Sequence, residues 1–341
     1  MDITQLIINV AVLFVMMIPG IILKKCGMVS DTFGKGISNL VLYIAQPSLI
    51  LCAYLDCTLR FSEIWKNILW VLLFSVIAHL LFALVATRTF GSVPDGQRRM
   101  LRFATIFSNA AFMGIPLIQV VCGSEAAIYA SIYNITFNLF LWTLGVYLCT
   151  RVDGVDHDGD GDSDGIDELI GLHKTGKKEI SFTKVLLHPV TLASVVGVLC
   201  LILQINRVTM ELGMVWDCLS MLKGLVAPLS MVVIGLRLVD IQWKGAFGDR
   251  PMYWFLVLRH ILLPLGVLAL MKGVVLAGIS IPWLAQDVIL IMAATPAASS
   301  ATMFAEKYDC DAAYVSRLVV VSTVLCIVTM PLIIGLSHMI G

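Results

Sequence analysis

Charged residues are scarce in this sequence. They make up 13% of its 341 positions, whereas an ordinary soluble domain carries about 25%. Basic and acidic residues number 23 each, so the chain lacks the basic excess of proteins that bind nucleic acids. Because 59% of the residues are hydrophobic, we expect lipid to solvate most of the chain and nucleic acid not to be a partner.

Motifs for metal binding and catalysis are also missing. The nine cysteines form no Cys-x-x-Cys pair and lie mostly in apolar runs, which predicts neither a zinc site nor a disulfide framework. His-Glu-x-x-His, Gly-x-Ser-x-Gly and the phosphate-binding Gly-x-x-x-x-Gly-Lys-Ser/Thr are absent. We therefore expect no enzyme, no cofactor, no metal and no ATP-driven pump. The first apolar run lacks a basic leader and a cleavage site, so we interpret it as a mature span.

Long apolar stretches dominate what is present. A bilayer core of roughly 30 Å takes about 20 helical residues to cross, and backbone polar groups must be paired within lipid. The sequence therefore predicts an all-α membrane protein with ten transmembrane helices. They cover residues 4–23, 36–55, 67–87, 99–122, 125–149, 184–205, 214–237, 252–273, 285–305 and 312–337.

The loops differ in basic charge. Those after odd-numbered spans hold fifteen lysines and arginines, and those after even-numbered spans hold four. Because basic loops stay in the cytoplasm, we expect a multi-pass protein of the cell (inner) membrane with both termini extracytoplasmic.

A polar segment divides the chain into residues 1–150, a linker over 151–182, and residues 183–341. Within the linker, Asp160, Asp162, Asp164 and Gly165 have the spacing of a calcium loop. Gly171 stands where the EF-hand loop needs a bidentate glutamate. We prefer a solvated acidic cytoplasmic linker and keep calcium binding as the alternative.

The two halves show internal similarity. Residues 46–49, 108–111 and 123–129 match residues 227–230, 295–298 and 310–314, in the same order and at a slowly drifting spacing. Five spans per copy would make the second copy enter the membrane from the opposite side, as in many secondary transporters. The alternative is chance similarity between apolar helices.

Spans 4 and 9 carry helix-breaking residues near their middles. Gly114 and Pro116 predict a break in span 4, with Pro116 in the first turn of a new half-helix. Pro296 predicts a second break, next to Thr295 and Ser299. Free half-helix ends at the midplane attract anions such as carboxylates, and Asn109 adds an amide. The alternative is a pair of proline kinks without a site.

Other polar residues lie within the spans. Asn134 and Asn138 share one helix face in span 5, and Gln46 and Ser48 flank Pro47 in span 2. They could line the same cavity or make hydrogen bonds between helices. Ionisable residues also occur in or near spans, but we assign none of them to a proton relay. They are His79, Asp217, Lys223, Arg259, His260 and Arg317.

Residues 109–117, Asn-Ala-Ala-Phe-Met-Gly-Ile-Pro-Leu, resemble the first crossover of the auxin efflux carrier family. That family includes plant PIN-FORMED auxin exporters and bacterial malonate-permease-like proteins. Residues 294–296 and 304–308 are similar to its second-half motifs, Ala-Leu-Pro and Phe-Ala-Lys-Glu-Tyr. The resemblance covers essentially the whole chain. The short central loop favours a bacterial malonate-permease-like member and a small carboxylate over auxin.

The resemblance implies a 5+5 inverted repeat with broken, crossing helices 4 and 9, like that of bile-acid symporters and Na⁺/H⁺ antiporters. A transport domain of helices 3–5 and 8–10 would move against a scaffold of helices 1, 2, 6 and 7. The implied substrate is an organic anion. The substrate-binding residues we expect are Ser48, Asn109, Gly114, Pro116, Asn134, Thr295, Pro296 and Ser299.

We therefore expect a secondary active transporter of a small organic anion, with a malonate-like dicarboxylate as one candidate. Coupling to a proton, to a sodium ion or to the membrane potential alone stays open, as does a homodimer. The alternatives are a cation/proton exchanger, which should carry carboxylates at the breaks, a passive anion channel, and a receptor or structural protein without flux.

Overall fold

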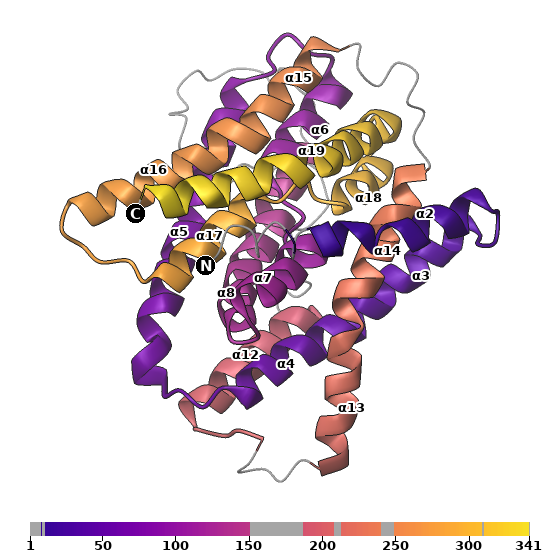
Figure 1. Ribbon diagram of the computed structural model, residues 1–341. Helices are drawn as coiled ribbons and strands as arrows, with labels where there is room; N and C mark the ends of the chain where they lie inside the picture. The colour runs from indigo at the N-terminus through magenta and orange to yellow at the C-terminus, as the bar shows by residue number, and fades with distance from the viewer. Residues whose placement is uncertain are drawn as a thin grey trace.

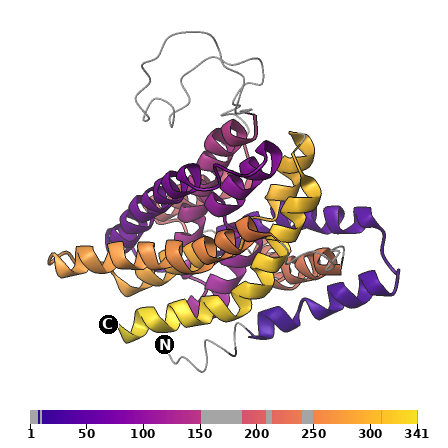
Figure 2. The ribbon, with the colours of Figure 1, turned by 90° about the horizontal axis from the view of Figure 1, so that it is seen from above.

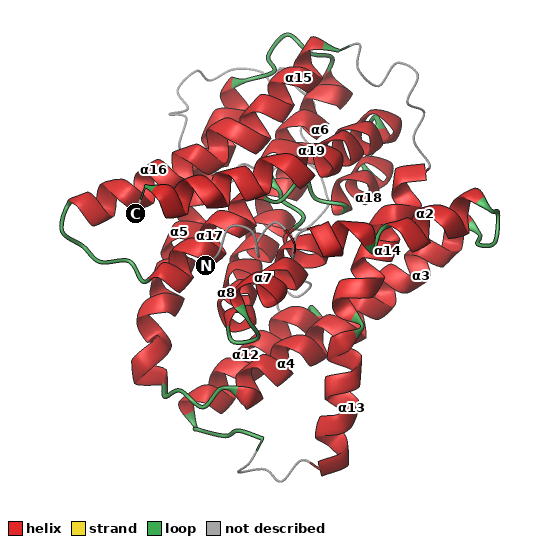
Figure 3. Ribbon diagram, in the orientation of Figure 1, coloured by secondary structure: helices red, strands yellow, loops and turns green. Residues whose placement is uncertain are grey.

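The computed structural model describes residues 8, 11–150, 187–207, 213–239, 249–308 and 310–340. These residues form helices and connecting loops, with no strand among them (Figure 3). Six of the helices are long and apolar enough to cross a membrane: Thr32–Asp56, Phe61–Arg88, Ala126–Thr150, Gly213–Val239, Arg250–Leu276 and Ala312–Met339. Shorter apolar helices cover Ala110–Cys122, Pro189–Ile202 and Trp283–Ala294. The prediction of an all-α membrane protein is confirmed at this level.

Among the described residues of the first half, helices lie in each predicted apolar range. In order they are α2 (Ile18–Lys25), α3 (Asp31–Leu40), the π-helical turn η1 (Val41–Ala45), α4 (Gln46–Asp56), α5 (Phe61–Arg88), α6 (Asp95–Ile106), the π-helical turn η2 (Ala110–Gly114), α7 (Ile115–Cys122), α8 (Ala126–Phe140), the π-helical turn η3 (Leu141–Gly145) and α9 (Val146–Thr150).

Helices also lie in each predicted apolar range of the second half, among the described residues. Its helices are α12 (Pro189–Ile202), α13 (Gly213–Gly224), α14 (Val226–Val239), α15 (Arg250–Val257), the π-helical turn η4 (Leu258–Leu262), α16 (Leu263–Leu276), α17 (Trp283–Ala294), α18 (Ser300–Lys307) and α19 (Ala312–Met339). The acidic linker and its calcium-loop pattern from Asp160 lie outside the described residues.

Three prolines follow π-helical turns. Pro47, Pro116 and Pro264 each stand two residues after the end of η1, η2 or η4. A proline ring clashes with the carbonyl four residues earlier, which in all three cases belongs to the π-helical turn. We attribute the wider turn to this clash, because it moves that carbonyl aside and lets the helix continue.

The predicted break at Gly114 and Pro116 is therefore wrong in position. The chain runs from η2 into α7 without interruption, and Pro116 lies in the first turn of α7. The actual interruption comes earlier, at residues 107–109.

The helices form two groups (Figures 1 and 2). Helices α2, α3, α4, α12, α13 and α14 lie on one side, and helices α5–α8 and α15–α19 lie on the other. In the first group α2 packs against α14, and α4 packs against α12. In the second group α17 is buried almost throughout and packs against α5, α8 and α19.

Candidate functional site

The two interrupted helices meet in the interior. Residues 107–109 follow the end of α6, and residues 295–299 follow the end of α17. These short segments run antiparallel, with Ser108 opposite Ala297. The Asn109 N–H donates to the Pro296 carbonyl at 2.7 Å, and the Ala298 N–H donates to the Phe107 carbonyl at 2.9 Å. Both helices are thus interrupted, and the interrupted segments lie against each other. We call residues 107–109 and 295–299 the crossing.

Four helix ends converge on the crossing. Helices α6 and α17 arrive with their C-terminal ends, and the Ala110–Cys122 helix and α18 leave with their N-terminal ends. A helix N-terminus carries free N–H groups and about half a positive charge, and a C-terminus carries free carbonyls and about half a negative charge. The crossing therefore offers an attractive site to an anion on one pair of ends and to a cation on the other pair.

Arg259 binds the pair of C-terminal ends. Its Nη1 donates to the Thr105 carbonyl in the last turn of α6 at 3.2 Å, and its Nη2 donates to the Thr295 carbonyl just after α17 at 2.7 Å. The side chain is fully buried, and its guanidinium lies 5.3 Å from the ring centre of Phe82. The sequence alone gives Arg259 no role that distinguishes it from the other intramembrane charges.

The neighbouring His260 supports the second broken segment. Ser322 Oγ on α19 accepts the Ala297 N–H at 3.0 Å and is joined to His260 Nε2 by a hydrogen bond of 2.8 Å. His260 Nδ1 lies 3.1 Å from Thr329 Oγ1. His260 and Ser322 are fully buried, so this chain of hydrogen bonds fixes the extended backbone at Ala297 from inside the protein.

Asn109 lies at the N-terminus of η2 with an exposed fraction of 3%. Its carbonyl accepts the N–H groups of Met113 and Gly114, both at 3.1 Å. Its side-chain Nδ2 has no hydrogen-bond partner among the described residues. An amide donor buried without a partner costs roughly 1–3 kcal/mol, so this position suits a ligand with acceptor atoms.

Five other predicted site residues also lie at or beside the crossing. Gly114 faces the end of α17, where an added Cβ would lie 2.5 Å from Met292 Sδ and 3.5 Å from Thr295 Cγ2. Pro116 is buried in the first turn of α7. The Pro296 carbonyl accepts the hydrogen bond from the Asn109 N–H. The Thr295 hydroxyl donates to the Met292 carbonyl at 2.8 Å. Ser299 lies directly before α18.

Asn134 and Ser48 lie on neighbouring helices. Asn134 is buried on α8, and its Oδ1 has no hydrogen-bond partner in the described part of the chain. Ser48 is buried on α4, where its hydroxyl donates to the Ile44 carbonyl at 2.9 Å. Within the same residues, no hydrogen bond joins either side chain to the crossing.

Two side chains from the group of α2–α4 and α12–α14 bind the starts of the two helices that leave the crossing. Gln46 Nε2 on α4 donates to the Ala111 carbonyl, and Arg237 Nη1 on α14 donates to the Ser299 carbonyl at 2.9 Å. The sequence pointed weakly to Gln46 through its position beside Pro47. It gives no sign of the role of Arg237, which lies at the end of span 7.

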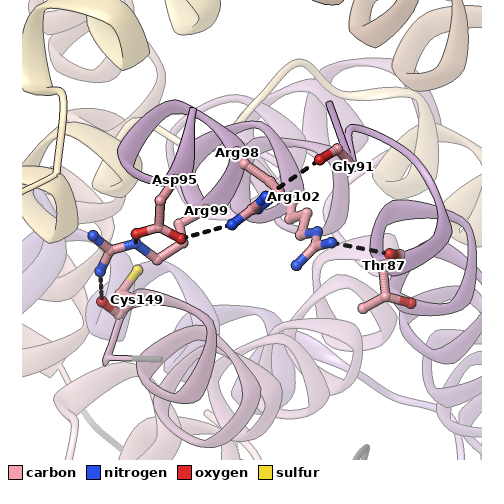
Figure 4. Close-up of polar contacts among 7 residues, drawn as sticks. All are labelled: Thr87, Gly91, Asp95, Arg98, Arg99, Arg102 and Cys149. Carbon is pink, nitrogen blue, oxygen red and sulfur yellow. Dashed lines mark hydrogen bonds and ion pairs between the residues drawn. The ribbon is translucent and has the colours of Figure 1, made fainter. Parts of the chain in front are cut away.

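A further arginine cluster anchors the start of α6 (Figure 4). Arg98 and Arg99 both form ion pairs with Asp95, at 3.0 and 2.9 Å. Arg99 Nη1 also donates to the Cys149 carbonyl at 2.7 Å, and Arg102 Nη2 donates to the Thr87 carbonyl at 3.2 Å. Both carbonyls are in the last turns of their helices, α9 and α5. The cluster thus ties α6 to the C-terminal ends of α5 and α9.

The family model for membrane transport proteins, which covers the auxin efflux carriers, matches residues 5–334. The chain belongs to this family. It is also 25% identical over 334 residues to an uncharacterized transporter of Methanothermobacter thermautotrophicus, and the match covers 96% of each chain. The family resemblance seen in the sequence is therefore confirmed, and the chain is a multi-pass membrane protein.

Proposed function

We propose that the protein is a secondary transporter that moves a small organic anion across the cell membrane by alternating access. The pairing of two interrupted helices inside an apolar helical protein carries this proposal. Irregular backbone is tolerated at membrane depth only where it is buried in protein or lines a cavity, and in transporters it forms the substrate site. The membership in a family of membrane transport proteins supports the same function.

The polar groups at the crossing favour an anion. The N-termini of the Ala110–Cys122 helix and α18 each contribute about 0.3–2 kcal/mol toward binding negative charge. The buried and unpartnered Nδ2 of Asn109 adds a hydrogen-bond donor. Residues 103–116 and 288–302 contain no aspartate or glutamate, whereas a cation/proton exchanger should carry carboxylates there. We propose a carboxylate as the substrate, with a malonate-like dicarboxylate as the first to test.

We also propose that the chain is a 5+5 inverted repeat, with residues 1–150 and 183–341 as its copies and 151–182 as the linker. Asn109 and Pro296, which are equivalent in the sequence repeat, are hydrogen-bonded to each other. The packing is reciprocal: α2 of the first span contacts α14 of the seventh, and α12 of the sixth contacts α4 of the second. Likewise α6 packs against α19, and α8 packs against α17.

The two helix groups suggest which parts would move. We propose that spans 3–5 and 8–10 form a transport domain and that spans 1, 2, 6 and 7 form a scaffold, with both termini extracytoplasmic. The hydrogen bonds from Gln46 to the Ala111 carbonyl and from Arg237 to the Ser299 carbonyl would join these two parts. Both bonds would have to break when one part slides past the other.

Uptake of radiolabelled malonate and other carboxylates into proteoliposomes tests this function. We expect saturable uptake by the wild type and a loss of about tenfold or more in Asn109→Ala, because a hydrogen bond to a charged group contributes roughly 1.5–3 kcal/mol. Asn67→Ala is the matched control, since the Asn67 amide donates to Tyr129 Oη at 3.2 Å, away from the crossing.

Three results would contradict the proposal. Unchanged uptake in Asn109→Ala would remove Asn109 from the site. Flux that never saturates would indicate a channel. Proton movement driven by added Na⁺ or K⁺ without any carboxylate would indicate a cation/proton exchanger.

A further inference from the structure

Arg259 is a buried cation that pairs with no carboxylate among the described residues. It has an exposed fraction of 0%, and no aspartate or glutamate in the described part of the chain forms an ion pair with it. It donates hydrogen bonds to the carbonyls of Thr105 and Thr295. Its Nε has no hydrogen-bond partner among the same residues. An unpaired charge buried this deeply would strongly destabilise a protein unless something else balances it.

The balancing charge comes from the two helix ends. Each helix C-terminus is equivalent to about half a negative charge, so α6 and α17 together supply roughly one unit against the single positive charge of Arg259. The ring of Phe82 faces the guanidinium from 5.3 Å and adds a cation–π contact. The π-helical turn η4 presents Arg259 from a neighbouring span, so the cation is tethered to the protein.

In transporters with interrupted helices, carbonyls of unwound backbone and the C-terminal ends of half-helices are the groups that coordinate a coupling Na⁺ ion. In this protein the Thr105 and Thr295 carbonyls belong to that class, and both already accept hydrogen bonds from Arg259.

We propose that Arg259 is a built-in cation that occupies the place of a coupling cation. The crossing then keeps its geometry without bound Na⁺, and the two remaining N-terminal ends are left for the anion. This inference rests on the proposed function for its meaning in transport, but the position of the cation can be tested without any substrate. Arg259 is a positioning residue in this scheme, because it holds the two helix ends and does not touch the anion.

Thermal unfolding of the purified protein in detergent, in NaCl, LiCl, KCl or choline chloride at equal ionic strength, tests the inference. We expect the wild-type Tm to be the same in all four salts. Arg259→Ala should lower the Tm in choline by roughly 5–15 °C, because two charge-assisted hydrogen bonds are lost. Na⁺ or Li⁺ should recover a measurable part of that loss, because a small cation can take the vacated carbonyls.

Arg102→Ala is the matched control. Arg102 also donates to a carbonyl near a helix C-terminus, that of Thr87 at 3.2 Å, but this carbonyl belongs to the last turn of α5, outside the crossing, and the Arg102 side chain is partly exposed. Any loss of stability in this variant should therefore be the same in all four salts.

Three outcomes overturn the inference. The wild-type Tm could be higher in Na⁺ than in choline, or the Tm of Arg259→Ala could equal that of the wild type. The third is an Arg259→Ala variant whose lowered Tm is not raised by Na⁺ or Li⁺. The last result would reduce Arg259 to a structural clamp. If Arg259→Ala does not fold, Arg259→Lys should be more stable than Arg259→Met, and equal stability of these two variants also overturns the inference.

The readout separates this inference from the proposed function. Normal transport by Asn109→Ala together with a Na⁺-responsive Arg259→Ala would remove the anion site and leave the built-in cation standing. Impaired transport by Asn109→Ala together with an Arg259→Ala variant whose Tm does not respond to Na⁺ would support the anion site and refute the built-in cation.

Discussion

At the scale of single residues, Gly114 shows how closely the two interrupted helices approach. The space for a side chain at this position is already filled by Met292 of α17 and by Thr295, which follows it. Met292 and Thr295 are fully buried, so they have little room to withdraw. A residue without a Cβ therefore lets η2 lie directly against the end of α17. Its part in the structure is close packing, and the helix does not break there.

We expect Gly114→Ala to destabilise the protein by about 1–3 kcal/mol, as overpacking does in other cores. The added Cβ would lie 2.5 Å from Met292 Sδ, and that side chain would have to move. Thermal unfolding in detergent measures the loss, and carboxylate uptake should fall with it.

The Met292→Ala background supplies the control for this variant. Removing the large side chain should relieve the clash, so Gly114→Ala in that background should cost much less than in the wild type. Equal costs in both backgrounds would show that Met292 is not the source of the clash.

At the scale of helices, the group formed by α2–α4 and α12–α14 depends on two reciprocal close contacts between α2 and α14. A Cβ added at Gly20 would meet the backbone carbonyl of Val232, and one added at Gly235 would meet the backbone carbonyl of Met17. Small residues that let two helix backbones approach are a common basis of association in membranes, where the hydrophobic effect does not drive helices together.

Gly235→Ala should therefore separate α2 from α14 and lower stability by about 1–3 kcal/mol, because a backbone carbonyl cannot rotate out of the way. The Tm in detergent measures the effect. Gly36→Ala on α3 is the matched control: no atom lies within 4 Å of its added Cβ, and alanine favours helix over glycine by about 1 kcal/mol. A Gly235→Ala variant as stable as Gly36→Ala would contradict the packing.

Helices also show where prediction from the sequence reaches its limit. Pro116 and Pro296 are alike in the sequence, yet only Pro296 lies within an interrupted segment. Near Pro116 the π-helical turn absorbs the clash, and the helix is instead interrupted at residues 107–109. Those residues contain no proline or glycine. Their non-helical form is stabilised by hydrogen bonds to Pro296 and Ala298, which are far away in the sequence and which no local pattern reveals.

At the scale of the whole molecule, the basic loops predict the orientation in the membrane. Two native cysteines lie on opposite sides in this prediction: Cys26 directly follows α2, and Cys57 lies between α4 and α5. Cys26 is exposed, and Cys57 is partly exposed.

We expect a membrane-impermeant maleimide to label a variant that keeps only Cys57 in intact cells, because its loop should be extracytoplasmic. A variant that keeps only Cys26 should be labelled only after the cells are permeabilised. The reverse pattern would invert the proposed orientation, and labelling of both in intact cells would refute the assignment of the first two spans.

The sequence by itself determined the membrane class, the position of the apolar helices, the family and two of the residues that meet at the crossing, Asn109 and Pro296. These follow from hydropathy, loop charge and local motifs, which are properties of neighbouring residues. Only the tertiary structure decided where span 4 is interrupted and what Arg259, Gln46 and Arg237 bind. Their partners are backbone carbonyls of distant segments. Every residue has a backbone carbonyl, so the sequence does not show which carbonyls are free to accept a hydrogen bond.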